Sequence, residues 1–304
     1  MRRKPRSPFP QRDGLDAVRL RTPDGGTWPT MRDHLVDRLP IAAAEVDRML
    51  REQRVAGPGG LVDAETPFAP RTSLWMQRET APEPPVPHSV EVLHRDADIL
   101  VADKPHFLAT TPRGGHITET ALVRLRRELE LPELSPAHRL DRMTAGLVLF
   151  TVRPDARREY QGLFQDRAVR KEYLAVARHD PQLVLPRTVR SRIVKERGVL
   201  QAQEVPGPPN SETRVELIEH RDGLGRYRLL PTTGRTHQLR VHLAALGVPI
   251  AGDDLYPQVR DRADDDFTDP LQLLASVLEF RDPRTGLLRR FETRRTLESW
   301  PAPR

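Results

Sequence analysis

Apolar positions in the first part of the chain follow a helical pattern and then a hairpin pattern. Within residues 42–53, Val46, Met49 and Leu50 recur at the i, i+3 and i+4 spacing of one helical face, which predicts a helix. In the next segment, 54–62, a glycine- and proline-rich turn separates two short apolar pieces, which indicates a hairpin. We therefore expect a small compact unit here.

The pattern divides the chain into four parts. Residues 1–27 begin with a run of basic residues and predict a basic flexible tail, which is either a solvated segment or an arm that contacts phosphates. Residues 28–80 form the compact unit. Residues 81–87 have the sequence APEPPVP and predict a stiff linker, because proline is excluded from helix interiors. Residues 88–304 form the larger domain.

From residue 88 onward the pattern changes to short strands with scattered helices. Strands and helices that do not alternate strictly predict an α+β domain with a mixed, mainly antiparallel central sheet. The segments with strand-like apolar runs are Val90–Leu93, Ile99–Ala102, Leu147–Val152 and Leu174–Ala177. The segments with helical spacing are Thr118–Leu129, Ala156–Phe164 and Thr236–Leu246.

Charge and composition narrow the classes of partner and site. The 304 residues include 49 Lys and Arg against 43 Asp and Glu, a formal net charge of +6, which favours a polyanion such as nucleic acid. The chain has no cysteine, which excludes a disulfide framework, a thiolate nucleophile and any cysteine-ligated zinc or iron–sulfur site.

Targeting and membrane signals are weak. The N-terminal sequence MRRKPRSPFPQR is followed by no apolar segment, so it does not predict a signal peptide. The longest apolar runs, such as Leu147–Val152, are far shorter than the roughly 20 residues that a membrane span needs. We expect a soluble cytoplasmic protein with no membrane association.

A polar segment with the sequence HRLDRMTAG precedes the predicted strand at Leu147–Val152. In it, Asp141 lies between Arg139 and Arg142, whose charges favour an ionised carboxylate. An ionised carboxylate in a cleft can act as a covalent nucleophile on an electrophilic carbon. An aspartate that only pairs with arginine or caps a turn has the same local pattern and is more frequent.

Two further segments carry candidate chemistry. Tyr173 begins an apolar strand, where its ring either stacks on a base or packs as an ordinary half-buried tyrosine. In the segment GRTHQLRVHL, Thr236 is a suitable N-cap, and Arg240 lies one turn later, where it can meet a carboxylate. His237 and His242 are five positions apart, a poor spacing for two metal ligands on one helix, so we expect no metal site.

Together and in this order, these segments resemble the signature blocks of the RluA-type pseudouridine synthase family. The family pattern H-R-L-D-x-x-T-S-G is matched from His138 to Gly146, with Ala145 in place of serine. The blocks K-x-Y-L-A and G-R-T-H-Q-(I/L)-R-V-H-L match at 171–175 and 234–243, and G-x-P-I-x-G-D follows. Upstream, DILVADKP is similar to the family's D-x-x-x-V-x-x-K-P strand, and the resemblance covers residues 88–300.

The resemblance implies a function and residue roles. The family isomerises uridine in rRNA or tRNA to pseudouridine, with an aspartate nucleophile acting on a flipped-out base. It implies that Asp141 is the catalytic aspartate, that Tyr173 stacks on the uracil or transfers a proton, and that Arg240 pairs with the aspartate. It also implies that Arg139 fills the space left by the flipped base and that Leu273 packs on the uracil. We add His138 and Arg235, from the same blocks, as substrate-binding residues.

Three departures from the family pattern concern substrate choice and packing. Leu274 stands where relatives have histidine, Asp282 stands where they have the histidine of H-P, and Ala145 replaces a small hydroxyl residue. The unit at 28–80 is similar to the small α/β S-four-type RNA-binding module of many relatives, although its turn contains Pro58 and Gly59 where the module has polar residues.

Cofactors and competing functions follow from the same residues. Uridine isomerisation needs no group donor or redox partner, and the chain has no Walker loop or GxGxxG fingerprint, so we expect no cofactor and in particular no nucleotide cofactor. The absence of a GxSxG elbow argues against serine hydrolysis. We expect an RNA substrate and a monomer. The alternatives are a non-catalytic RNA-binding protein on the same fold and a carboxylate glycosidase, which normally needs a second catalytic acid.

Overall fold

The computed structural model describes residues 7–77 and 79–300. These residues fall into two compact units, Met1–Pro82 and Glu83–Arg304, which are described separately below.

The boundary between the units lies inside the predicted linker at 81–87, but most of that segment packs on the larger unit. Val86 is buried in the core of that unit. The Glu83 carboxylate accepts three backbone hydrogen bonds, from the N–H groups of Ile117, Thr118 and Glu119. Residues 83–87 are therefore part of the larger unit, because a buried apolar side chain and a fully used carboxylate hold them there.

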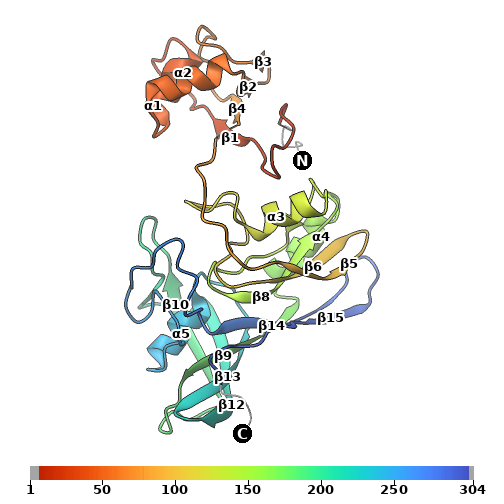
Figure 1. Cartoon of the computed structure of the whole chain (residues 1–304), viewed down its shortest axis with the longest axis vertical. Helices are drawn as coiled ribbons and strands as arrows, with labels where there is room; N and C mark the ends of the chain where they lie inside the picture. The colour runs from red at the N-terminus through yellow and green to blue at the C-terminus, as the bar shows by residue number, and fades with distance from the viewer. Residues whose placement is uncertain (1–6, 78, 301–304) are drawn as a thin grey trace. The chain divides into compact units, whose positions relative to one another are not determined.

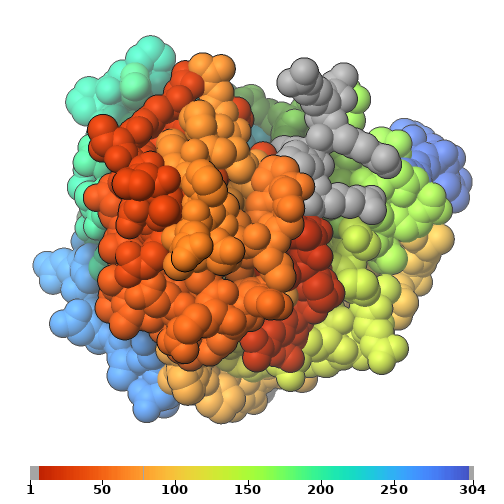
Figure 2. All heavy atoms as spheres, turned by 90° about the horizontal axis from the view of Figure 1, so that it is seen from above, coloured from red at the N-terminus to blue at the C-terminus, as the bar shows by residue number. Residues whose placement is uncertain are grey.

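The first unit is an antiparallel sheet with two helices. Its strands lie in the order β1-β4-β2-β3, and the helices bury Leu35, Val46 and Leu50 against the sheet. Figure 2 shows the outer surface of this unit in red to orange. Helix α2 and the β2–β3 hairpin confirm the predicted helix and hairpin. The elements are β1 (Val18–Arg21), α1 (Met31–Arg38), α2 (Ala43–Arg51), β2 (Val55–Gly57), β3 (Gly60–Leu61) and β4 (Ser73–Met76).

Strand β1 lies where the sequence predicted a flexible tail. It pairs with β4, and Val18 and Leu20 pack against the core while Arg19 and Arg21 are exposed. Because two arginines alternate with two apolar residues on an edge strand, this short segment has the composition of a solvated tail. The first six residues, which carry much of the tail's predicted charge, lie outside the described residues.

The second unit is built on one large sheet. Its strand order is β11-β10-β12-β13-β9-β14-β8-β6-β5, with β15 paired to β14 and β7 to β8. Figure 1 labels most of these strands. Among its described strands, β8 and β14 form a parallel pair and the other pairs are antiparallel, which confirms the predicted mixed sheet. The strands are β5 (Glu91–Arg95), β6 (Ile99–Lys104), β7 (Ser135–Pro136), β8 (Ala145–Thr151), β9 (Val169–Arg178), β10 (Arg187–Val194), β11 (Gln203–Val205), β12 (Ser211–Arg221), β13 (Leu224–Pro231), β14 (Leu273–Arg281) and β15 (Leu288–Glu292).

Helices cover both faces of this sheet. Alternate residues of β6 point to opposite faces, so Leu100 packs in the core with α3 (Ala121–Glu128) and α5 (Gln238–Ala245), whereas Ile99 packs with α4 (Arg157–Gln165). These helices and strands β5, β6, β8 and β9 confirm the predicted elements. Among the described residues, no helix is long and apolar enough to cross a membrane.

Candidate active site

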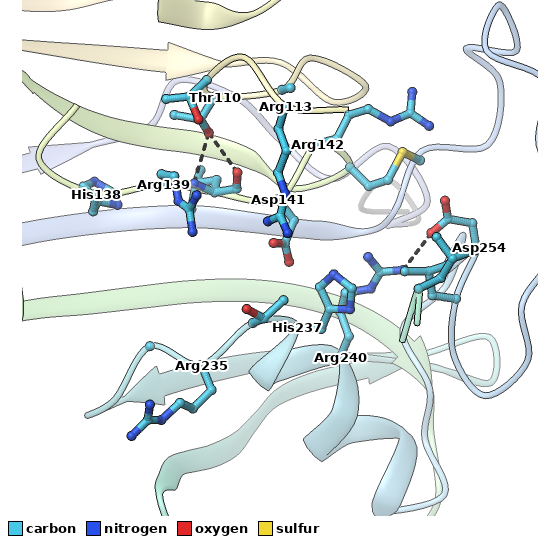
Figure 3. Close-up of a pocket in the computed structure, with 18 of the residues that line it drawn as sticks. Thr110, Arg113, His138, Arg139, Asp141, Arg142, Arg235, His237, Arg240 and Asp254 are labelled. Carbon is cyan, nitrogen blue, oxygen red and sulfur yellow. Dashed lines mark hydrogen bonds and ion pairs between the residues drawn. The ribbon is translucent and has the colours of Figure 1, made fainter. Parts of the chain in front are cut away.

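The large sheet carries a cavity of about 930 Å³ beside the start of β8 (Figure 3). The turn before β8 forms one wall and the start of α5 forms the opposite wall. A second cavity of about 110 Å³ shares part of this lining and extends to Leu273. Both cavities are lined by all three predicted catalytic residues: Asp141, Tyr173 and Arg240.

Asp141 lies in a turn that leads directly into β8. The backbone N–H of Thr144 donates to the carbonyl oxygen of Asp141 at 3.1 Å, which closes the turn. The half-buried Asp141 side chain points across the cavity toward His237 and Arg240 (Figure 3). The turn therefore presents a carboxylate at the edge of the sheet.

Gly146 allows β8 to lie close against β14, its parallel neighbour in the sheet. Its φ is +109°, and a Cβ at this position would lie 2.3 Å from the carbonyl oxygen of Ala275. Only glycine fits both this backbone conformation and this approach. The last residue of the HRLDRMTAG segment thus sets the parallel pairing that positions the turn before it.

Polar side chains from outside the turn hold the backbone on both sides of Asp141. The Thr110 hydroxyl donates to the carbonyl oxygen of Leu140 at 2.8 Å and accepts the Leu140 N–H at 3.1 Å (Figure 3). His106 Nδ1 donates to the carbonyl oxygen of Met143 at 2.7 Å. The carbonyl groups next to Asp141 are therefore fixed by partners from outside the turn.

Lys104 lies beneath the same turn and is fully buried. Its ammonium group donates to the carbonyl oxygens of Pro105 and Leu108, both at 2.8 Å, and of Arg142 at 3.3 Å. Burial lowers the pKa of Lys104 to about 7, and the charge of Asp141 opposes this shift. This lysine of the DILVADKP segment thus stabilises the turn from below through hydrogen bonds to backbone carbonyl groups.

His138 is tied to the sheet by its imidazole ring. Its Nε2 accepts the backbone N–H of Leu149 at 3.1 Å, and its ring stacks on Phe164 with centroids 4.3 Å apart. Burial lowers the pKa of His138 to about 3, so the ring is neutral. The ring lines the larger cavity, but one of its two nitrogens is already bound to β8.

Tyr173 projects from β9, between β13 and β14. It is half-buried and pairs with Leu229 and Ala275 in the neighbouring strands. Burial raises the pKa of Tyr173 well above its usual value, and the charge of Asp141 raises it further. The side chain is therefore a neutral phenol beside the carboxylate.

Arg240 differs from the prediction in its partners. Its guanidinium binds Asp253 through Nε at 2.9 Å and Asp254 through Nη2 at 2.7 Å, and within the described residues no ion pair to the Asp141 carboxylate is formed. Burial opposes the charge on Arg240, but the hydrogen bond to Asp253 and the charges of Asp253, Asp254 and Asp141 raise its pKa. Arg240 therefore acts on Asp141 through space, and its pairing partners come from the loop after Ile250.

The other predicted substrate contacts lie around the cavities. Arg139 and Arg235 are exposed at the rim, and Leu273 is buried in the floor of the smaller cavity. Basic side chains outnumber carboxylates in the lining. The basic residues are Arg113, Arg139, Arg142, Arg167, Lys171, Arg235, Arg240, Arg260 and Arg262.

Comparisons with known proteins point to one family. Residues 98–245 match the family model described as RNA pseudouridylate synthase. The dual-specificity RNA pseudouridine synthase RluA of Vibrio cholerae is 32% identical over 219 residues, which cover 68% of this chain and 83% of that protein. The chain belongs to the RluA-type family of RNA pseudouridine synthases.

Other relatives agree with this synthase assignment. The enzyme of the same name from Pasteurella multocida is 34% identical over 66% of this chain and 91% of that protein. The solved structure of human RNA pseudouridylate synthase domain containing 1 superposes with a TM-score of 0.52 and 28% identity, and covers 69% of this chain and 85% of that one. The protein is thus an isomerase that acts on uridine in RNA, and the fold of its larger unit is that of a pseudouridine synthase.

Sequence reasoning missed several residues that build the synthase site. The hydrogen bonds around Asp141 and His237 involve Thr110, His106 and Tyr256. None of these three residues lies in the sequence blocks that suggested the catalytic residues, and no local sequence pattern marks them. The helix α5 begins after His237, so the predicted N-cap at Thr236 is wrong. Within residues 7–77 and 79–300, no group of three or more His, Asp or Glu side chains is placed to hold a metal ion.

Proposed function

We propose that this synthase converts particular uridines of structured rRNA or tRNA to pseudouridine, with Asp141 as the nucleophile on a flipped-out nucleotide. The observation that carries the proposal is the placement of the Asp141 carboxylate in a cavity with Tyr173 and Arg240. The backbone around Asp141 is fixed, while its carboxylate has no ion-pair partner in the described part of the chain. Such a group is held in place and still available to a substrate.

A flipped base suits the shape and chemistry of this site. Removing a nucleotide from its stack costs a few kcal/mol. Stacking on the neutral ring of Tyr173 returns about 1–3 kcal/mol, and Leu273 offers an apolar contact in the smaller cavity. In this proposal Arg139, which is exposed at the rim, fills the gap that the base leaves in the RNA.

The basic rim supports RNA as the substrate. Its arginines contact phosphates without reading sequence, which positions the strand over the cavity. We include the first unit in this proposal as an S-four-type module that adds RNA contacts, and we place the enzyme in the cytoplasm as a monomer. The excess of positive charge at the rim predicts that RNA binding weakens as salt rises.

Pseudouridine mapping tests the proposed substrate. Total RNA from a strain lacking the gene is mapped and compared with RNA from strains that carry the wild type or Asp141→Asn. The proposal expects one or more rRNA or tRNA sites to lose pseudouridine in the deletion strain and to recover it only with the wild type. Recovery with Asp141→Asn contradicts the role of Asp141. RNA binding without any change in the map supports the alternative of a non-catalytic RNA-binding protein.

A further inference from the structure

His237 stands at the start of α5 in an unusual backbone conformation. Its φ is +56°, in the left-handed region that few residues other than glycine adopt. Residues held in this region often lie at functional sites, where the surrounding structure maintains them. The His237 ring lines both cavities and lies across from Asp141 (Figure 3).

The hydrogen bonds of Tyr256 decide which nitrogen of His237 carries the proton. The Tyr256 hydroxyl accepts the N–H of Ala202 at 2.7 Å and donates its only proton to the carbonyl oxygen of Ala202 at 2.8 Å. His237 Nδ1 lies 3.0 Å from the same hydroxyl. Because the phenol proton is assigned to the carbonyl oxygen of the buried residue Ala202, which has no other donor in the described structure, the geometry assigns Nδ1 as the donor in this contact. Burial raises the pKa of Tyr256 to about 12, so the phenol keeps its proton at neutral pH.

The second nitrogen of His237 is then an acceptor. A neutral imidazole has one proton, so the Nδ1–H form leaves a lone pair on Nε2. Within the described residues, Nε2 has no hydrogen-bond partner, and the atom is not fully buried, so a ligand in the cavity can reach it. A fixed lone pair therefore opens into the cavity that holds Asp141.

Charged groups around His237 come from four parts of the chain. Burial lowers the pKa of His237 below its usual value, and the neighbouring positive charges lower it further, while the carboxylates oppose this shift. At neutral pH the ring is therefore neutral. The facing groups are Asp141 before β8, Lys195 after β10, Arg240 on α5, and Asp253 and Tyr256 on the loop after Ile250.

We propose that His237 Nε2 accepts a hydrogen bond from the target uridine next to Asp141. Uridine within RNA offers two donors to such a group, the uracil N3–H and the ribose 2′-hydroxyl. A protonated His237, or one with its proton on Nε2, has no acceptor at Nε2 and fails in this role. The inference rests on the proposed function, because it assumes that the uridine enters this cavity.

Two substitutions separate this role from a purely structural one. His237→Gln places an amide oxygen near the position of Nε2, whereas His237→Asn reaches only the position of Nδ1 and retains the donor to Tyr256. Asparagine also tolerates a positive φ well. A structural role therefore predicts that Asn retains more activity than Gln, and an acceptor role predicts the reverse.

The measurement is tritium release from RNA labelled at uracil C5, with kcat and KM determined for each variant. We expect a loss of about 3- to 10-fold for His237→Asn, the value of one hydrogen bond, and a smaller loss for His237→Gln. The proposal is wrong if His237→Asn is as active as His237→Gln or more active. His179→Gln, outside both cavities, is the matched control and is expected to retain wild-type rates.

Modified RNAs identify the donor, and a spectrum tests the tautomer. The dissociation constant is measured for RNAs with N3-methyluridine or 2′-deoxyuridine at the target, with wild type and with His237→Asn. The modification that removes the donor is expected to weaken RNA binding by the wild type but to cause no further loss of affinity in His237→Asn. If the effect of each modification simply adds to that of His237→Asn, the proposal is wrong. Nitrogen-15 NMR of the free enzyme is expected to show His237 with Nε2 unprotonated. An Nε2–H tautomer overturns the inference even if the wild type is active, whereas an inactive wild type with the expected tautomer contradicts only the proposed function.

Discussion

Replacing Thr110 by valine isolates what the clamp on Leu140 contributes to the site. The Thr110 side chain is buried, and its hydroxyl satisfies both the N–H and the carbonyl oxygen of Leu140, the residue before Asp141. Valine has nearly the same shape as threonine but offers neither bond. The substitution therefore leaves packing nearly unchanged and removes two hydrogen bonds from the backbone of one residue, Leu140.

The expected loss follows from these two bonds. A buried backbone group left without a partner costs about 1–3 kcal/mol. Leu140 is 8% exposed and both it and Thr110 line the larger cavity, so water can reach one of the two groups. We expect the free energy of unfolding to fall by about 2–4 kcal/mol. Release of the backbone also lets Asp141 shift, which is expected to lower kcat about 10- to 100-fold.

Urea unfolding and tritium release from 5-tritiated uridine in RNA give the two readouts. Thr110→Ser is the matched control, since it keeps the hydroxyl and loses only a methyl group. It is expected to retain a kcat close to that of the wild type. If Thr110→Val turns over at the wild-type rate and unfolds at the wild-type urea concentration, the clamp does not position Asp141 and the reasoning is wrong.

Three further changes test other parts of the account. Gly146→Ala places a Cβ against the Ala275 carbonyl group at a φ of +109°, so urea unfolding is expected to show that the free energy of unfolding falls by about 3 kcal/mol or more. An unchanged free energy of unfolding contradicts the close approach of β8 to β14. The pKa of Lys104 is about 7 in the folded state and 10.5 in the unfolded state, so the folded state binds fewer protons between pH 7 and 10.5. The free energy of unfolding of the wild type should therefore rise with pH across this range relative to that of Lys104→Met. If the two proteins show the same dependence of stability on pH, the pKa of Lys104 is not lowered. Leu200→Ala removes a side chain that is 64% exposed on the cavity wall, and it is expected to raise the KM for RNA about 10-fold. Leu288 is 65% exposed and lies outside both cavities, so Leu288→Ala is expected to leave KM unchanged. Equal effects of the two substitutions would show that Leu200 does not contact the RNA.

Several segments with clear apolar patterns were predicted from sequence, whereas the solvent-facing strands β10 and β12 were not. Helix α2 and the buried strands β6 and β8 have clear apolar patterns. Strands β10 and β12 were missed because charged residues alternate along them. Arg190 and Glu212 form an ion pair across these two strands on the exposed face, so the segments look like polar loops in sequence.

The site was predictable as a set of residues but not as a set of contacts. The order of three sequence blocks correctly brought Asp141, Tyr173 and Arg240 to one cavity. The pairing of Arg240 with Asp253 depends on a loop whose path no local pattern specifies. His237 was considered only as a metal ligand, since its left-handed backbone and its bond to Tyr256 arise from tertiary packing.

The central claim is that Asp141 is the nucleophile, and one assay tests it most directly. Tritium release from RNA labelled at uracil C5 is measured for the wild type, for Asp141→Asn and for Asp265→Asn, an exposed aspartate that lines neither cavity. RNA affinity is measured in parallel. The account predicts that Asp141→Asn binds RNA nearly as well as the wild type but releases no tritium, while Asp265→Asn releases it at the wild-type rate. Tritium release by Asp141→Asn at or near the wild-type rate would contradict the claim.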